Sequence, residues 1–428
     1  MAPATTRVPD TEQPLVVVSA DCHIGPRLRD DLRPYCPSSL LDEFDDFADH
    51  VDELRARIYG KIEGRKGAGL SRNRRTDGHF DMDARRADLD HEGVAAEIVF
   101  HGSQNEEPLP WGSFVVFLPP DTDDPALVGA GREIYNRWLA DACATDPARH
   151  VGLAQLPMWD VESATREAIR AHGAGLRGLN FPAPGPGITP YNDAAWEPFW
   201  TACEERGLVL STHSGAGNPD SWNGPEAMVL VQLESGGWMS RRAMHQMVFG
   251  GVFERHPGLR LVLTEQPGTW WEPTMNEFDS VYRTQGWMLG SRITRPPSEY
   301  CTEHVMIGGS FLAPFEARDA VDHGYATNVM WGSDYPHTEG TWQHPEPDDE
   351  VESFGRVSLR HTFADIPADA TVAMIGENAV RVYGLDRATL QQVAVRIEAP
   401  TLHDLGEPVD RVPAGAGMFA FRSFGPWA

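Results

Sequence analysis

Five side chains that can bind a metal ion follow short apolar runs of this sequence. They are Asp21 and His23 in "LVVVSADCH", His213 in "LVLSTH", Glu265 in "RLVLTE" and Asp334 in "NVMWGSD". Asp21 and His23 are separated by one residue, Cys22. On an extended chain both therefore point to one side, while Cys22 points to the other side and packs. A carboxylate and an imidazole in this arrangement chelate a metal efficiently.

Each of these residues taken alone has a plainer explanation, as a helix cap or a buried polar group with a hydrogen-bond partner. Taken together they favour a metal site. Carboxylates that converge at several strand ends repel one another unless a cation lies between them.

The elements that would position these donors are eight β-strands separated by amphipathic helical stretches. The expected strands are 15–21, 97–101, 151–156, 177–181, 208–213, 260–265, 304–308 and 328–334. Helical periodicity lies between them, for example over 130–145, 161–174, 194–206 and 240–255. Eight such units predict an α/β fold, a (β/α)8 TIM barrel whose strand ends meet at one mouth.

The 428 residues are expected to form a single domain, 1–428, around this barrel. Residues 24–96 and 102–130 break the regular pattern and are expected to be insertions after the first and second strands, as lids or solvated loops. A last helix is expected near 369–383, and the C-terminal extension, about 387–428, is expected to be irregular.

Composition excludes several classes of partner. With 63 acidic and 36 basic residues the formal charge is −27, which would repel nucleic acid and anionic membrane surfaces. The N-terminal residues lack the apolar run of a signal peptide or membrane anchor, so a cytoplasmic protein is expected. Five widely spaced cysteines without a CxxC pair indicate reduced thiols. A homodimer is compatible with a barrel of this size, although no interface pattern is visible.

Several motifs resemble the amidohydrolase-related family of barrel enzymes, often called amidohydrolase 2, over nearly the whole chain. They are "SADCH", "THSG", "HPGLRLVLTE", "WGSDYPH" and "GENAVRVYGLD". The resemblance implies a hydrolase or nonoxidative decarboxylase with one divalent metal, commonly zinc or manganese. Asp21, His23, His213 and Asp334 fall on the positions of the family's metal ligands.

The chain departs from the family pattern on its first, sixth and fourth strands. Asp21 stands where many relatives have the first His of His-x-His, and Glu265 stands where they have an acid/base His. Asn180 on the fourth strand offers no bridging carboxylate for a dizinc site. A mixed imidazole and carboxylate set suits iron or manganese. The chain therefore resembles the family branch that uses a nonheme diiron centre to activate dioxygen.

That resemblance predicts an oxidoreductase, a monooxygenase of secondary metabolism such as antibiotic biosynthesis. Its two Fe ions would be bound by Asp21, His23, His213, Glu265, Asp334 and His337, with Glu265, His337 and Asp334 as the catalytic residues. His101, Glu339 and Asn180 are weaker candidates near the same mouth. The substrate would be a bulky apolar group, such as a diterpenoid, carried as a coenzyme A (CoA) thioester. No GxGxxG fingerprint follows an expected strand, so electrons would come from a ferredoxin and its reductase.

Two other functions remain open. In the alternative, one Zn or Mn ion polarises a carbonyl or activates water in a hydrolase or decarboxylase, with Glu265 as general acid/base. A third hypothesis is a barrel that binds a ligand without turnover. Metal identity and number discriminate among the three.

Two further sets of residues are candidates for contact with such a substrate. Trp111, Trp270, Trp271 and Trp342 either wall an apolar pocket or pack in the core. The basic stretch Arg65, Lys66, Arg72, Arg74 and Arg75 either meets CoA phosphates or forms a solvated charged loop.

Overall fold

A computed structural model describes residues 11–59, 72–113, 122–214, 227–346 and 352–409, with 412, 419, 421–423 and 425–426 beyond them. Its centre is one sheet of eight strands in sequence order, each parallel to the next. The strands are β1 Val18–Ile24, β2 Ala96–His101, β3 His150–Gln155, β4 Gly178–Asn180, β5 Val209–His213, β6 Leu261–Thr264, β7 Val305–Ser310 and β8 Val329–Gly332. The predicted (β/α)8 fold is confirmed.

The sheet closes through hydrogen bonds between β1 and the segment that follows β8. His23 N–H donates to Tyr335 O at 2.6 Å, and Asp334 N–H donates to Asp21 O at 2.9 Å. Cys22 and Tyr335 form a parallel bridge at the same place. The first and last strands therefore meet at the residues that carry candidate metal donors.

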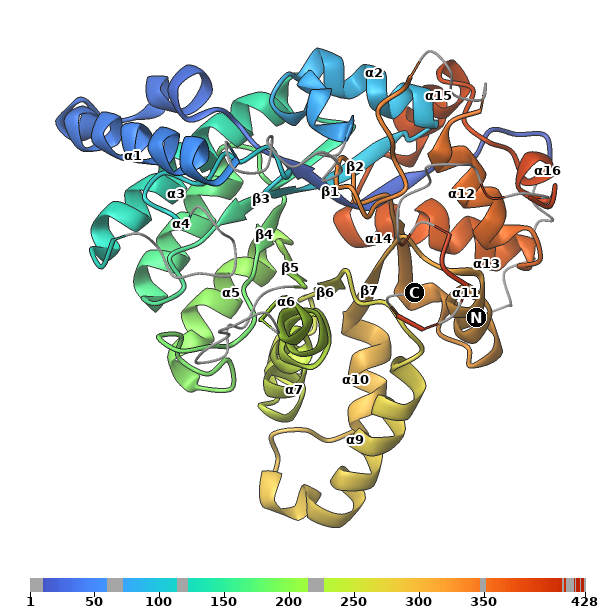
Figure 1. Ribbon diagram of the computed structural model, residues 1–428. Helices are drawn as coiled ribbons and strands as arrows, with labels where there is room; N and C mark the ends of the chain where they lie inside the picture. Colours follow the sequence, from blue (N-terminus) through green and yellow to red (C-terminus); the bar gives the residue numbers. More distant parts are fainter. Residues whose placement is uncertain are drawn as a thin grey trace.

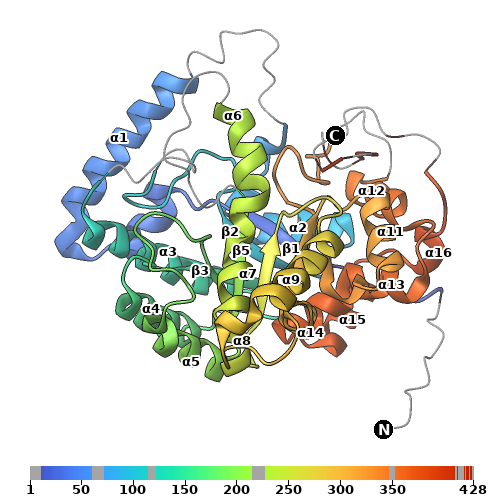
Figure 2. The ribbon, with the colours of Figure 1, turned by 90° about the horizontal axis from the view of Figure 1, so that it is seen from below.

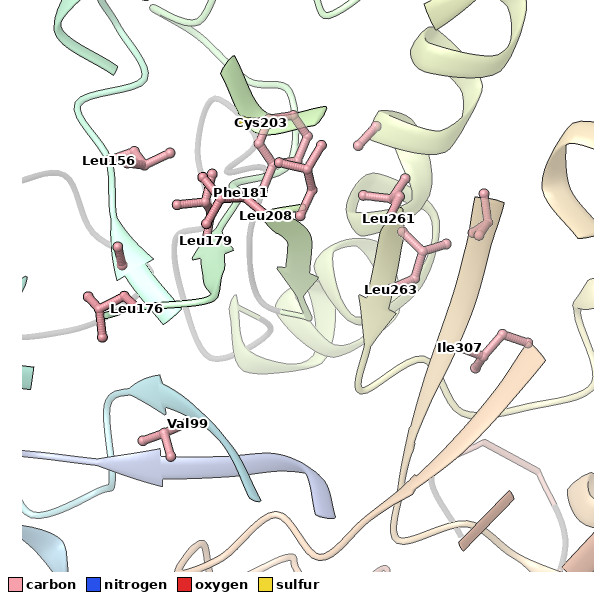
Figure 3. Close-up of a cluster of buried hydrophobic side chains, with 14 of the residues drawn as sticks. Val99, Leu156, Leu176, Leu179, Phe181, Cys203, Leu208, Leu261, Leu263 and Ile307 are labelled. Carbon is pink, nitrogen blue, oxygen red and sulfur yellow. The ribbon is translucent and has the colours of Figure 1, made fainter. Parts of the chain in front are cut away.

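Side chains alternate between the barrel interior and the layer under the helices. On β6, Val262 belongs to the inner cluster, whereas Leu261 and Leu263 belong to the outer one. Figure 3 shows part of this outer layer, with Leu261 and Leu263 on β6 beside Ile307 of β7. The period of two is what a strand that is buried on both faces requires.

Helices surround the strands (Figure 1). They are α1 Leu41–Tyr59, α2 Met82–Glu92, α3 Pro125–Ala144, α4 Val161–Gly173, α5 Glu197–Arg206, α6 Ala227–Leu230, α7 Ser240–Phe249, α8 Val252–Arg255, α9 Trp271–Gln285, α10 Pro297–His304, α11 Pro314–Asp322, α12 Phe354–Phe363, α13 Ala368–Val372, α14 Asn378–Tyr383, α15 Arg387–Arg396 and α16 Leu402–Leu405. The predicted helix over 240–255 is split into α7 and α8 at Gly250 and Gly251, and Gly251 has a φ of +68°.

The expected insertions contain regular structure. Helices α1 and α2 lie between β1 and β2, and α3 begins at Pro125 within the range expected to be irregular. Figure 2 shows α1 and α6 rising on the same side of the barrel, while α14 and α15 lie at the opposite end. In the described part of this sequence, no helix combines the length and apolarity needed to cross a membrane.

The C-terminal extension is not wholly irregular, contrary to the expectation. Leu390 and Ala394 of α15 are buried in the same cluster as the inner strand residues, so this helix helps to close the barrel end. Further on, the buried Arg422 pairs with Glu316 at the start of α11 and donates to Phe311 O. Sequence periodicity alone did not reveal α15 because the helix is short and its polar face dominates.

Candidate metal centre

Strand β1 places Asp21 and His23 toward the barrel interior through a bulge. Ser19 pairs with Glu97 and Cys22 with Val99, so β1 has one more residue than β2 between these pairs. The extra residue reverses the alternation: Val18 and Ala20 face the inner core before it, and Asp21 and His23 approach the candidate site after it.

The other donors follow strands at the same mouth. His213 is the last residue of β5, whereas Glu265 and Asp334 lie just beyond β6 and β8. Glu265 has a φ of +53° and Asp334 a φ of +56°, a left-handed conformation that is uncommon for residues other than glycine. Such strain concentrates at functional sites, where the surrounding structure maintains it.

The donor atoms converge on two overlapping groups. One contains Asp21, His23 and His213, and the other contains His23, Asp334 and His337. His23 Nε2 lies 3.3 Å from Asp21 Oδ1 and 3.2 Å from Asp334 Oδ1. His213 Nε2 lies 3.5 Å from Asp21 Oδ1, and His337 Nδ1 lies 2.9 Å from Asp334 Oδ1.

Hydrogen bonds to backbone carbonyls determine which nitrogen of each imidazole turns a lone pair toward this cluster. His23 Nδ1 lies 3.2 Å from His101 O, His213 Nδ1 lies 2.8 Å from Ser214 O, and His337 Nε2 lies 2.7 Å from Gly102 O. A carbonyl only accepts, so each of these nitrogens carries the hydrogen. The opposite nitrogens therefore face carboxylate oxygens, and only a proton or a metal cation resolves that contact.

Four buried atoms at the centre of the cluster have no hydrogen-bond partner. They are Asp21 Oδ1, His23 Nε2, His213 Nε2 and Asp334 Oδ1. Buried polar atoms are rarely left without a partner, and two imidazole nitrogens with two carboxylate oxygens are competent ligands for zinc or manganese. The residues present fit a divalent metal ion.

The geometry favours one cation over two. Both donor groups contain His23, whose Nε2 has a single lone pair to share between them. Glu265 belongs to neither group of the described residues. The predicted pair of irons is therefore not supported.

Glu265 lies on the other side of the His213 ring. Its Oε2 is 3.4 Å from His213 Nδ1, the nitrogen that faces away from Asp21, and it accepts a hydrogen bond from Ser214 Oγ. Burial raises the pKa of Glu265 to about 8. The carboxyl group is thus placed to hold a proton beside the donor cluster.

The ionisable groups of the cluster shift one another's pKa values. Burial opposes charge on His213 and His337, but Asp21 and Asp334 respectively outweigh it and raise the pKa of each to about 10. Burial also opposes charge on Asp21, yet His213 and His23 hold its pKa below the usual range. The site carries negative charge that protons or a cation must balance.

The remaining predicted residues lie around this cluster. His337 stacks on His23 with ring centroids 3.8 Å apart, and Glu339 accepts from Gln104 Nε2 at 2.9 Å. The His101 side chain contacts Tyr135, away from the donor groups, and burial lowers its pKa to about 3. Asn180 ends β4 next to Ser211 and also lies outside the donor groups.

Two supporting residues, Ser310 and Arg85, were not predicted from the sequence. Ser310 Oγ donates to Asp21 Oδ2. The buried Arg85 donates to His23 O at 2.8 Å while it binds both oxygens of Glu97 at 2.6 and 2.7 Å. Ser310 ends β7, so it could have been found in the same way as the metal donors, as a polar residue at the end of an apolar strand. Arg85 lies in a helix within the range that was expected to be an insertion.

Most of the other candidate substrate contacts have structural roles. Arg74 pairs with Glu106 and Arg75 with Glu346, which removes the expected role of these arginines toward CoA phosphates. Arg65 and Lys66 lie outside the described residues.

Three of the four tryptophans are part of the packed interior. Trp111 packs on Phe44, Trp271 on Tyr325, and Trp342 on Tyr335. Trp270 remains partly exposed.

Comparisons with known proteins identify a family and several similar proteins. A family model described as amidohydrolase matches residues 119–385. The 2-amino-3-carboxymuconate-6-semialdehyde decarboxylase of Dictyostelium discoideum is 22% identical over 322 residues, 72% of this chain and 77% of that protein. The gamma-resorcylate decarboxylase of Rhodococcus jostii is 30% identical over 141 residues, 30% of this chain and 42% of that protein.

A solved structure supports the same fold. The 5-carboxyvanillate decarboxylase of Novosphingobium aromaticivorans, in complex with manganese and 4-hydroxy-3-methoxy-5-nitrobenzoic acid, superposes with a TM-score of 0.58. It is 19% identical and covers 88% of this chain and 98% of its own. At this identity the likeness establishes the fold alone.

The predicted diiron monooxygenase is wrong, because these curated relatives are decarboxylases. The same finding contradicts the rest of that prediction: the oxidoreductase class, dioxygen, the ferredoxin partner, the CoA-linked diterpenoid substrate and antibiotic biosynthesis. The prediction of two irons depended on a donor set that included Glu265, and this residue lies outside both donor groups of the described residues. The structure separates Glu265 from the ligand groups.

Proposed function

Because the chain belongs to the amidohydrolase family, we propose that it is a single-metal, nonoxidative decarboxylase of a small aromatic carboxylic acid. The observation that carries the proposal is the convergence of four unpartnered donor atoms, from Asp21, His23, His213 and Asp334, beside the separate carboxyl group of Glu265. The decarboxylase relatives favour this reaction over hydrolysis.

The metal would be bound by these four residues, with manganese or zinc as the ion that suits their mixed oxygen and nitrogen donors. When bound, such a cation would supply positive charge that attracts substrate oxygens and stabilises negative charge developing on them. His337 would orient Asp334 when protonated, since its Nδ1 lies 2.9 Å from Oδ1, and Ser310 holds the second oxygen of Asp21.

Glu265 supplies the proton in this proposal. Ser214 holds Oε2, so the proton is carried on Oε1 and passes to the ring carbon that bears the carboxylate. Two π electrons of the ring form the new C–H bond. The bond between that carbon and the carboxylate then breaks, its electron pair returns to the ring and restores aromaticity, and carbon dioxide leaves. Solvent returns a proton to Glu265, and no oxidant or reductant is consumed.

The first experiment combines metal analysis with an activity assay. Protein purified without chelator is expected to contain about one manganese or zinc ion per chain by inductively coupled plasma mass spectrometry. It is expected to release carbon dioxide from an acid in a panel that includes 2,6-dihydroxybenzoate and 5-carboxyvanillate, at equal rates under air and argon. Hydrolysis of esters or amides without carbon dioxide release, or a requirement for dioxygen, would overturn the proposal.

A further inference from the structure

Arg241 is the second residue of helix α7, which packs against β5 and β6, the strands that lead to His213 and Glu265. Its Nε donates to Gln266 Oε1 at 2.8 Å. Gln266 is buried, and its own Nε2 donates to Glu265 O at 3.1 Å. These two bonds tie the guanidinium to the strand end that carries the proposed proton donor.

The plane of the Arg241 guanidinium is held by Trp270, whose ring centroid lies 4.0 Å from Arg241 Cζ. With one face on an indole and Nε bonded to Gln266, the group presents the edge formed by its two Nη atoms. This planar fork matches the two oxygens of a carboxylate.

No carboxylate of the described residues pairs with Arg241. Burial lowers its pKa to about 9, and no neighbouring acid compensates. The two most deeply buried arginines of the mouth region contrast with it, because Arg85 binds Glu97 and Arg422 binds Glu316. A half-buried cation that is rigid yet unpaired has an unsatisfied preference for an anion.

We propose that Arg241 binds a carboxylate group of the substrate through its two Nη atoms, and so makes the site selective for aromatic acids. This inference rests on the proposed function and names the specificity residue of that site. The formal charge of −27 repels anionic substrates at long range, so a positive side chain at the mouth would add to the attraction that the proposed metal ion exerts on an anionic substrate. Trp270 lies against the same guanidinium and offers a flat surface at that position.

The test measures binding directly, so that it does not depend on turnover. Manganese-loaded protein is titrated by calorimetry with 4-hydroxy-3-methoxy-5-nitrobenzoic acid and with its methyl ester, which keeps the ring and removes the carboxylate. Wild type is expected to prefer the acid. Arg241→Met is expected to weaken binding of the acid about tenfold to hundredfold and to leave binding of the ester nearly unchanged.

Two variants control for folding and for local charge. Arg241→Lys keeps the charge without the fork and is expected to fall between wild type and Arg241→Met. Arg242→Met removes the neighbouring guanidinium, which donates to Pro184 O at 3.1 Å and lies over Trp238, and is expected to retain the preference for the acid.

Three results would overturn the proposed binding of the carboxylate by Arg241. They are no binding of the acid by wild type, a preference for the acid that survives in Arg241→Met, and competition by inorganic phosphate as strong as by the acid. If wild type binds the acid through Arg241 but releases no carbon dioxide from any acid, the binding role of Arg241 is supported and the decarboxylase proposal fails.

Discussion

The two nitrogens of His213 separate two chemical roles at the distance of one imidazole ring. Nε2 faces Asp21 and the donor cluster, and Nδ1 faces the backbone of Ser214 and the carboxyl group of Glu265. The proposed metal site and the proposed proton donor therefore contact different nitrogens of the same imidazole and do not compete for one atom.

This division predicts different failures for two isosteric substitutions. Glu265→Gln is expected to keep the metal but lower kcat by about a hundredfold or more, because an amide cannot deliver the proton. Asp21→Asn is expected to lose the metal itself. Metal content per chain and kcat, measured on the same preparations, check both. Loss of metal from Glu265→Gln would place that carboxylate among the ligands instead.

The close approach of Gly332 to Asp21 gives a second prediction. A Cβ built there would lie 2.8 Å from Asp21 Cβ and 3.1 Å from Asp21 N, so Gly332→Ala must displace the carboxylate or its backbone. Metal affinity is expected to fall about tenfold to hundredfold, the usual range for a displaced ligand support. A metal titration monitored by activity measures it.

The control is Gly173→Ala, since a Cβ at Gly173 meets nothing within 4 Å. That variant is expected to bind the metal as wild type does. An unchanged metal affinity in Gly332→Ala would show that Asp21 has room to move.

Strand-end residues were the part of the site that the sequence could predict. Asp21, His23, His213 and Asp334 each follow an apolar run, and the structure brings their donor atoms together. The position of Glu265 relative to the ligand groups was not predictable, because it depends on which face of the His213 ring it meets. Arg241 was missed because it lies in a helix, where an arginine is ordinarily a solvated surface residue.

At the scale of secondary structure, the short helix α2 supports β1 from within the first insertion. Arg85 joins the two elements, since it donates to His23 O and to Gly78 O while it binds Glu97 on β2. His150 of β3 adds a contact to Glu97 Oε1 at 2.8 Å. The insertion is therefore part of the support of the site.

Arg85→Met is expected to lower the free energy of unfolding by about 3–5 kcal/mol, because Glu97 would remain buried without its partner. Arg86→Met is the matched control one position along the same helix. The Arg86 side chain pairs with the exposed Asp83, so its loss is expected to change stability by less than about 1 kcal/mol. Urea denaturation of both variants provides the comparison, and equal stabilities would refute this role.

The predicted strands were nearly right, and the error at the end of the first strand has a physical cause. The expected first strand ended at residue 21, whereas β1 continues to Ile24. Apolar runs mark where a strand is buried in a hydrophobic core, but β1 continues as a strand through polar residues because the donor cluster surrounds them. The bulge in β1 leaves no trace in the hydrophobic pattern.

For the molecule as a whole, a buried acid away from the metal site links stability to pH. Glu92 ends α2 and accepts from Gly355 N at 2.7 Å at the start of α12, and burial raises its pKa to about 8. In the unfolded chain the same group titrates near 4.5. Between these values the folded protein binds a proton that the unfolded chain has lost, so stability falls as pH rises.

Glu92→Gln is expected to remove this loss of stability at higher pH, because the amide oxygen can still accept from Gly355 N and the amide carries no charge. Between pH 5 and 8 the Tm of wild type is expected to fall relative to that of Glu92→Gln. The free energy of unfolding is expected to change by about 1.4 kcal/mol per pH unit at most. Thermal denaturation of both proteins at several pH values checks the sign, and parallel profiles would contradict it.

The seam between β1 and β8 has a consequence for how the protein folds. Ser19 and Ser333, 314 positions apart in the chain, lie 3.0 Å from each other at this seam, next to Asp21 and Asp334. The donor cluster therefore cannot exist until the last strand has docked on the first, which makes it one of the most nonlocal contacts in the chain. A metal ion held there would join both ends of the barrel and slow its opening. The expected kinetic signature is an unfolding rate that falls with metal concentration, with a refolding rate that hardly changes.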